Sequence, residues 1–237
     1  MSVYRRELLL GSEHVDMHRR LRTSELFRLL QEASIRHTEE LGMGRDKTLD
    51  RGILWVLGLQ RAEVERMPEY DERIVLKSWP GRTMHVLFPR YYTVETAAGE
   101  PLIRASALWT LVDAKTRKLV FPEKVGVTIE GVTTGEEIPL PTAVPRVKYT
   151  NRAAFTVPYS YVDLNGHMNN SRYFDLAEDL TGAAAAGRQL REIRMEYASE
   201  ARYGRELTVS WEQDGSRYYI TGEGDSCVFR MGLTYRD

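Results

Sequence analysis

The sequence has a single cysteine, Cys227, among its 237 residues, so no disulfide can form within the chain. A lone thiol fits a reducing compartment, and we expect Cys227 to be a small buried side chain in a late strand. No window approaches about 18 consecutive apolar residues, which excludes a membrane-spanning helix. The N-terminus lacks the apolar run of a secretory signal peptide. These absences predict a cytoplasmic protein.

An excess of charge of one sign is also missing. Lys and Arg number 33 against 34 Asp and Glu, a net charge of −1, so no overall field favours nucleic acid or a membrane surface as a partner. There is no Gly-rich phosphate loop and no Gly-x-Ser-x-Gly elbow, so the sequence supports neither nucleotide binding nor a serine triad. We expect no cofactor.

The apolar residues that are present follow the periods of helices and strands. One face of a predicted helix over residues 24–38 carries Leu26, Leu29, Leu30 and Ala33. Strands are predicted over residues 53–66, 71–79, 85–96 and 102–112, and a linker with three prolines over 123–150. A second helix is predicted over residues 171–186, ended by Gly187.

The second half of the chain repeats the first. Val15-Asp16-Met17 recurs as Val162-Asp163-Leu164, and Ser24 and Phe27 recur as Ser171 and Phe174, all displaced by 147 positions. Matches displaced by 127 to 133 positions pair Arg61-x-Glu63 with Arg194-x-Glu196, Tyr70 with Tyr203, Trp79 with Trp211, and Arg90-Tyr91-Tyr92 with Arg217-Tyr218-Tyr219. The preserved order indicates a duplication. Because each copy combines one long helix with several antiparallel strands, we predict an α+β fold with the helix packed against the sheet.

The candidate functional site is the stretch that runs from Asp163 to Asn170. It brings an acid, amides and an imidazole to the start of the second helix, where unpaired backbone N–H groups favour developing negative charge. A plain capped loop would have the same composition. The first copy, however, has Asp16, His18 and Arg20 at the positions of Asp163, Asn165 and His167, and Met67 at the position of Glu200. A purely structural role would be expected in both copies, so the difference favours a functional corner in the second copy.

The run Asp163-x-Asn165-x-His167-x-Asn169-Asn170, followed by an aromatic-bearing helix, resembles the acyl-acyl carrier protein thioesterases of plants and bacteria. That family's second signature, Glu-Tyr followed after two residues by Glu, is matched by Glu196-Tyr197-Ala198-Ser199-Glu200. The resemblance spans essentially the whole chain, and the missing plant transit peptide points to a bacterial-type member. It implies a tandem hot-dog fold, in which each repeat is a long helix wrapped by an antiparallel sheet. We place the first repeat at residues 1–122, the linker at 123–150 and the second repeat at 151–237.

The resemblance implies hydrolysis of a fatty acyl-acyl carrier protein thioester to a free fatty acid. Many members carry a Cys directly after the second signature, where this chain has Ala201, so we expect activated water and no thiol-based acyl-enzyme. Glu200 is the expected general base, assisted by His167. Asn165 would hydrogen-bond the water or the carbonyl, and Asp163 would position the group or share the base role. Backbone N–H groups of residues 168–170 would hold the oxyanion.

Alternative interpretations remain for several residues. Asn169 and Asn170 are candidate substrate-binding residues that also fit helix caps, and Trp55 would either line an acyl tunnel or pack in the core. Strict strand alternation would make Glu200 a surface charge unless a bulge redirects it. A metal at His167 would lack further ligands at suitable spacing, so no metal is expected.

The expected partner is the acidic acyl carrier protein. A basic surface for it would be formed near the first copy's corner by Arg5, Arg6, Arg19, Arg20 and Arg22. The same arginines could instead be solvated charges or ion-pair partners of Glu. Two other functions stay open, an acyl-CoA thioesterase of hot-dog fold and a non-catalytic acyl-binding protein. The sequence does not specify acyl chain length or saturation, and a homodimer also stays open.

Overall fold

The structure is a computed structural model that describes residues 2–236. The outermost residues of the two predicted repeats, 1 and 237, therefore lie outside the described residues. The first half contains β1 (Tyr4–Leu9), α1 (Thr23–Glu40), β2 (Ile53–Val64), β3 (Arg73–Pro80), β4 (Leu87–Thr96), β5 (Pro101–Asp113) and the short α2 (Pro122–Val125). The second half contains β6 (Asn151–Thr156), α3 (Arg172–Thr181), β7 (Leu190–Tyr197), β8 (Glu206–Asp214), β9 (Arg217–Glu223) and β10 (Cys227–Tyr235). Short 3-10 turns precede the two long helices, η1 at Ser12–His14 and η4 at Tyr159–Tyr161.

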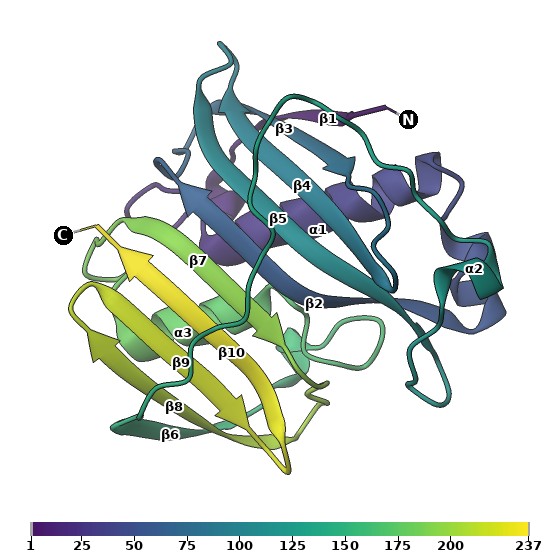
Figure 1. The fold of residues 1–237 in the computed structure, drawn as a ribbon. Coiled ribbons are helices and arrows are strands. Elements are labelled where there is room, and N and C mark those ends of the chain that lie inside the picture. The colour runs from purple at the N-terminus through teal and green to yellow at the C-terminus, as the bar shows by residue number, and fades with distance from the viewer. Residues whose placement is uncertain (1, 237) are drawn as a thin grey trace.

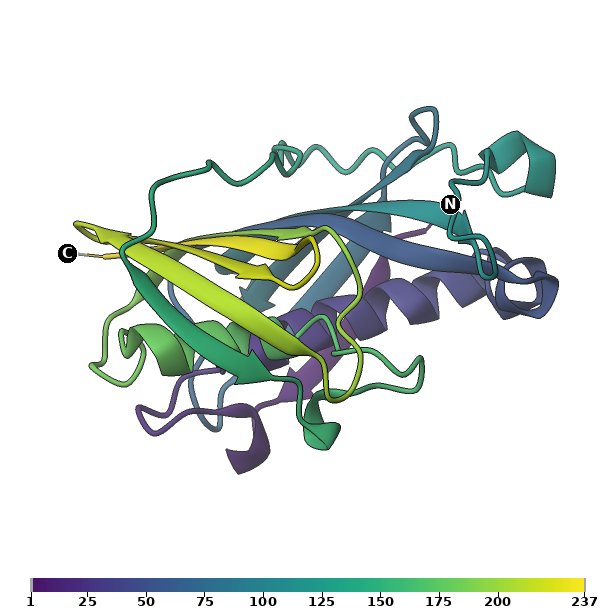
Figure 2. The same cartoon turned by 90° about the horizontal axis from the view of Figure 1, so that it is seen from below.

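The ten strands of residues 2–236 form one antiparallel sheet in the order β1-β3-β4-β5-β2-β7-β10-β9-β8-β6. The two halves have the same strand order, β1-β3-β4-β5-β2 from one edge and β6-β8-β9-β10-β7 from the other. They meet in the middle of the sheet, where β2 pairs with β7. Figure 1 shows α1 and α3 behind the sheet and the segment after α2 crossing in front of it toward β6. Figure 2 shows the same three layers from below. The predicted α+β arrangement, with the helices on one face of an antiparallel sheet, is confirmed.

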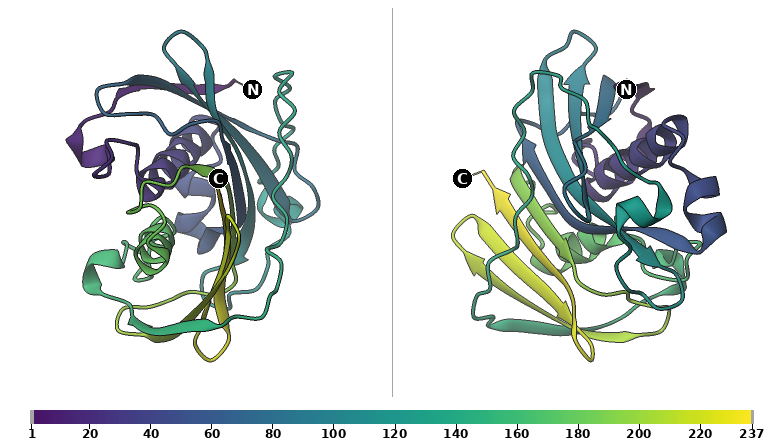
Figure 3. Two further views of the ribbon diagram at one scale, coloured as in Figure 1. Left: turned by 90° about the vertical axis from the view of Figure 1, so that its left-hand side faces the viewer. Right: turned by 45° about the vertical axis from the view of Figure 1, so that its right-hand side comes forward.

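Figure 3 shows the two helices on the concave side of the sheet, and the main hydrophobic core lies between these layers. The predicted α1 residues Leu26, Leu29, Leu30 and Ala33 are all buried. Phe27 of α1 stacks on Phe174 of α3 with ring centroids 4.1 Å apart, so the two helices share one core. Burying each large side chain contributes roughly 1.5–3 kcal/mol, which fixes the helix starts against the sheet and with them the two corners.

The two corners have the same backbone. Isolated β-bridges join Val15 to Leu21 and Val162 to Met168, a displacement of 147 positions for both partners. Across the middle of the sheet, Arg61 lies directly opposite its repeat equivalent, Arg194. The duplication inferred from these segments therefore holds in three dimensions.

Two of the sequence matches are wrong by one residue. Equivalent residues can be traced from strand to strand through the backbone pairing, starting at β2 and β7 and moving toward the two edges of the sheet. By this pairing, Glu212 is the equivalent of Trp79, and Tyr218 is the equivalent of Arg90. A shift of one residue moves a side chain to the other face of a sheet. Arg90 is accordingly buried against α1, whereas Arg217 is exposed.

The second helix is shorter than predicted, because α3 ends at Thr181 and not at Ala186. Gly182 adopts a left-handed conformation with φ of 64° and donates its N–H to Glu178 O, which ends the helix. The alanine run that follows forms a turn, and His18 and Arg20 of the first copy hydrogen-bond the carbonyl oxygens of Ala185 and Gly187 there. These contacts outweigh the helix preference of alanine.

Within residues 2–236, every helix is too short or too polar to cross a membrane.

Candidate active site

The corner that begins at Asp163 is a tight turn that leads into α3. The Asp163 side chain accepts the Asn165 N–H at 2.8 Å, the Asp163 N–H donates to His167 O at 2.9 Å, and Gly166 supplies a left-handed φ of 78°. Asp16 of the first copy makes the equivalent bond to the His18 N–H, also at 2.8 Å. Because both copies contain this bond, it explains the presence of Asp163 as a residue that shapes the turn.

Glu200 contacts His167. Its Oε2 lies 2.9 Å from Nε2 of His167, and the two side chains are 39% and 15% exposed. β7 ends at Tyr197, after which the N–H groups of Ala198 and Ser199 both donate to Val228 O at 2.8 and 3.1 Å. This bulge interrupts strand alternation and turns the chain, so Glu200 faces the corner and not the outer surface of the sheet.

Arg117 is a member of the site that sequence reasoning missed. It belongs to the turn after β5 in the first repeat, and its guanidinium lies 3.1 Å from Glu200 Oε1. Glu200 thus contacts an imidazole from its own repeat and a cation from the other. No local sequence pattern links Arg117 to Glu200, because the two meet only where the repeats join.

The amide side chains of the corner have different surroundings. Asn165 lies on the exposed tip of the turn, bound through its backbone N–H. Asn169 accepts the Ser171 N–H at 3.0 Å and the Ser171 hydroxyl at 2.8 Å, which satisfies a donor at the start of α3. The structure therefore brings together His167 and Glu200, sets Asn165 at the solvent edge, and binds the Asn169 side chain to Ser171, the residue before α3.

Asn170 connects the corner to the first repeat. Its Nδ2 donates to Gln31 Oε1 on α1 at 3.0 Å, and its carbonyl accepts the Tyr197 hydroxyl at 2.9 Å. The Tyr197 hydroxyl also lies 3.0 Å from Gln60 Oε1 of β2. Burial raises the pKa of Tyr197 well above its usual value, so the phenol stays neutral and donates. This network fixes the start of α3 against α1 and the sheet.

A cavity of about 250 Å³ lies in the first repeat between the C-terminal half of α1 and the sheet. Ser34 and Thr38 line it from α1, one and two turns beyond Gln31 on the same helix face. The predicted residue Trp55 is part of its wall and packs edge-on against Phe88, with ring centroids 4.7 Å apart. Ile35, Pro89 and Ile129 add further apolar surface. The wall is suited to an alkyl chain.

The first copy's corner lacks the counterpart of the His167–Glu200 contact. Arg20 stands at the position of His167, donates to Gly187 O at 3.0 Å and lies 3.6 Å from Asp16. Met67 stands at the position of Glu200 and lines a smaller cavity of about 180 Å³. Thr23 and Glu178 form the counterpart of the Asn170–Gln31 bond, at 2.5 Å. At these two equivalent positions, therefore, the second corner pairs an imidazole with a carboxylate and the first does not.

Both halves of the chain match models of known families. The acyl-ACP thioesterase N-terminal domain matches residues 1–125, and the acyl-ACP thioesterase C-terminal domain matches residues 145–234. An acyl-[acyl-carrier-protein] hydrolase of Cuphea viscosissima is 24% identical over 99% of this chain and 60% of its own length. A dodecanoyl-[acyl-carrier-protein] hydrolase of Cinnamomum camphora is 26% identical over 84% of this chain and 56% of its own length. The chain thus spans about 60% or less of these curated relatives.

Two solved structures share the fold over nearly the full chain. An acyl-ACP thioesterase from Bacteroides thetaiotaomicron superposes with a TM-score of 0.84 at 23% identity, covering 99% of this chain and 98% of that one. The 12:0-ACP thioesterase from Umbellularia californica gives 0.82 at 21% identity, covering 99% and 97%. These similarities confirm the predicted tandem hot-dog fold. With both domain models matched in order along the sequence, the chain belongs to the acyl-ACP thioesterase family.

Proposed function

We propose that this protein hydrolyses the thioester of a fatty acyl-acyl carrier protein, releasing a free fatty acid and the thiol of the carrier. The observation that carries the proposal is the 2.9 Å contact between His167 and Glu200 at the entry to α3. An imidazole and a carboxylate in contact can remove a proton from water and later return it to a leaving group. Membership of the family and the printed activities of the relatives support the same reaction.

In the proposed mechanism, Glu200 is the general base and His167 assists it. The water loses a proton to this pair, and the resulting hydroxide attacks the carbonyl carbon. The tetrahedral oxyanion then collapses, the C–S bond breaks, and the pair returns the proton to the departing sulfur. Asn165, on the exposed tip, would hydrogen-bond the water or the carbonyl, and Asp163 holds the turn in place.

Of the three backbone N–H groups expected to hold the oxyanion, those of residues 168–170, two already have acceptors within the protein. The N–H groups of Met168 and Asn169 already donate to Ala201 O at 2.7 Å and Tyr161 O at 2.8 Å. Within the described part of the chain, the N–H of Asn170 is the member of the three that has no such acceptor. Since Asn170 is also fixed through its side chain and carbonyl, its N–H is the preorganised donor that this chemistry requires.

The apolar cavity is the proposed acyl site. Gln31 contacts Asn170 at the corner, and Thr38, seven residues later on α1, lines the cavity. At a rise of 1.5 Å per residue this face of α1 covers roughly 10 Å. An acyl chain that starts at the corner and follows α1 would reach Trp55, which supports the assignment of Trp55 as a substrate-binding residue.

The proposal is tested by comparing the same acyl group on the carrier protein and on coenzyme A. Release of free acid from the carrier thioester, with a higher kcat/KM than from the CoA thioester, is expected. A preference for CoA would favour the alternative acyl-CoA thioesterase. Binding of the acyl carrier without any release of acid would leave a non-catalytic acyl-binding protein.

A further inference from the structure

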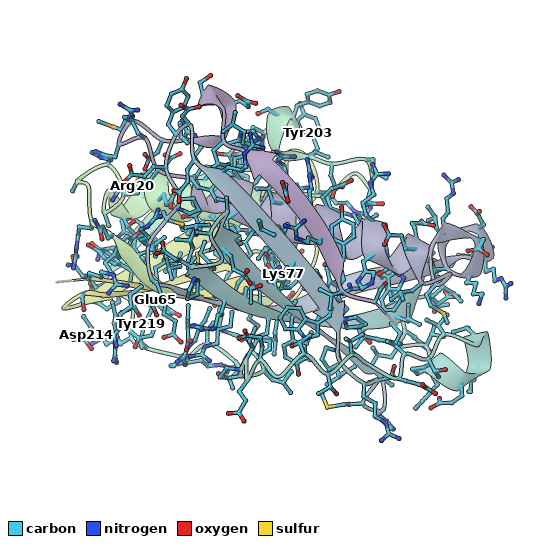
Figure 4. All side chains as sticks on the ribbon, turned by 90° about the horizontal axis from the view of Figure 1, so that it is seen from above. Arg20, Glu65, Lys77, Tyr203, Asp214 and Tyr219 are labelled. Atoms are coloured by element: carbon cyan, nitrogen blue, oxygen red, sulfur yellow. The ribbon has the colours of Figure 1, made fainter. Side chains whose placement is uncertain are left out.

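Three large apolar side chains stand in solvent beside His167. Tyr159, Leu164 and Tyr203 are 81%, 93% and 65% exposed. The rings of Tyr159 and Tyr203 meet edge to face with centroids 6.1 Å apart, and the backbone bridge between His167 and Arg202 holds Tyr203 next to the corner. Figure 4 shows Tyr203 at the edge of the molecule. We call these three residues the apolar rim.

A basic turn borders the same corner. Lys115, Arg117 and Lys118 follow β5 of the first repeat and are all exposed. The 3.1 Å contact of Arg117 with Glu200 places this turn beside the catalytic pair. A protein that delivers a substrate to Glu200 must therefore pass close to both the apolar rim and this turn.

The first copy's corner shows which part of this surface belongs to the turn architecture. Met17 and Tyr70 are the equivalents of Leu164 and Tyr203 and are 79% and 43% exposed. Ser12 occupies the position of Tyr159, and the Arg19 guanidinium lies 5.4 Å above the Tyr70 ring. An exposed apolar tip is thus common to both corners, but within residues 2–236 the first corner has no counterpart of the Tyr159–Tyr203 ring pair.

We propose that the apolar rim and the basic turn together form the docking surface for the acyl carrier protein, and this inference rests on the function proposed above. Tyrosines that are rigid and half apolar are favoured anchors in protein interfaces. Exposed lysines opposite an acidic partner steer its approach and set its orientation. The acidic carrier is the partner that fits this surface, because the surface combines positive charge with exposed apolar side chains beside His167 and Glu200.

The arginine cluster expected from the sequence lies at the other corner. Arg20 is only 15% exposed and bonds main-chain carbonyl oxygens, and Arg22 donates to Val15 O at 2.9 Å. These two side chains are used to hold the first corner together. The inference therefore moves the docking surface to the corner that carries the reactive pair.

The test uses two double variants, Tyr159→Ala with Tyr203→Ala, and Lys115→Glu with Lys118→Glu. The matched control is Met17→Ala with Tyr70→Ala at the first corner. KM is measured with an acyl carrier protein thioester and with the N-acetylcysteamine thioester of the same acid, which has no protein to dock. The two rim and turn variants should raise KM for the carrier thioester about tenfold and leave the small thioester unchanged, with the lysine effect larger at low salt. The control should change neither.

Binding to a carrier loaded with a non-hydrolysable amide analogue is measured in parallel, so that a failure of the hydrolysis assay does not decide the docking question. Weaker binding of the two variants supports the surface even if the wild-type protein releases no acid, a result that would overturn only the proposed function. Unchanged carrier binding and KM would overturn the inference. So would a change in sedimentation of the Tyr159 and Tyr203 variant with unchanged carrier binding, because the rim would then join two copies of this chain.

Discussion

The Arg117 guanidinium of the first repeat lies 3.1 Å from the carboxylate of Glu200 in the second. Both side chains are 39% exposed, so the pair contributes less than about 1 kcal/mol to stability. Its effect is on position, because it holds one carboxylate oxygen while His167 contacts the other. Side chains of both repeats thus meet at this corner, although the His167–Glu200 contact lies within the second repeat alone.

Arg117→Gln should lower kcat several-fold on any thioester substrate with little change in melting temperature. The physical reason is a less constrained Glu200 carboxylate. Arg117→Lys keeps the charge and should recover part of the loss. Steady-state kinetics and thermal unfolding of the three proteins check this, and an unchanged kcat in Arg117→Gln would show that Arg117 does not position Glu200.

The Asn170–Gln31 bond has a built-in control in its equivalent, Thr23–Glu178. Gln31→Leu should cost about 1–2 kcal/mol of stability and lower kcat, because the start of α3 loses its link to α1. Thr23→Val should cost a similar amount of stability without changing kcat. Equal effects of both variants on kcat would mean that only general stability is at work.

Trp55→Phe should shift the preferred substrate toward longer acyl chains, since the smaller ring enlarges the cavity. Among the described residues the Trp55 indole N–H has no acceptor, so the change sacrifices no hydrogen bond. Trp79→Phe is the control, because Trp79 is buried away from the cavity wall. A panel of chain lengths on the carrier protein measures the shift. If Trp55→Phe has the same chain-length preference as the wild type, the cavity does not bind the acyl chain.

Glu178 should make the protein less stable as pH rises toward neutrality. Burial raises the pKa of Glu178 to about 7, and repulsion from Asp175 and Asp16 adds to this effect. The hydrogen bond from Thr23 and the charge of Arg22 lower the pKa but do not cancel the rise. Between its ordinary pKa of 4.5 and about 7 the folded state binds more protons than the unfolded state, so the free energy of unfolding falls with increasing pH.

Glu178→Gln should remove this loss, and at pH 8 it should be more stable than the wild type by on the order of 1–3 kcal/mol. At pH 4 the two proteins should be alike. Urea unfolding at several pH values provides the comparison. Parallel pH profiles for the two proteins would contradict the raised pKa.

The sequence was most informative where local pattern decides structure. The apolar stripe of α1 and the turn at Asp163 have short-range causes, and the duplication showed which corner carries both the imidazole and the carboxylate. It failed where the cause is distant. Gly182 ends α3 early, and the carbonyl oxygens after it are held by His18 and Arg20 from the other copy.

The position of Glu200 illustrates the same division. Strand alternation alone would have made it a surface charge, but the bulge at Ala198 and Ser199 redirects it. That bulge depends on Val228 of β10, a partner that the local sequence does not reveal. Arg117 was missed for the same reason, since its contact with Glu200 exists only because the repeats are joined through β2 and β7.

The central claim is that hydrolysis occurs at the second corner alone. Its most direct test measures kcat on an acyl carrier protein thioester for Glu200→Gln and His167→Ala, with Met67→Leu at the first corner as the matched control and circular dichroism to verify folding. We predict that the first two variants lose a factor of about 10²–10⁴ in kcat and that the control stays close to the wild type. Near-wild-type turnover in both Glu200→Gln and His167→Ala would contradict the account.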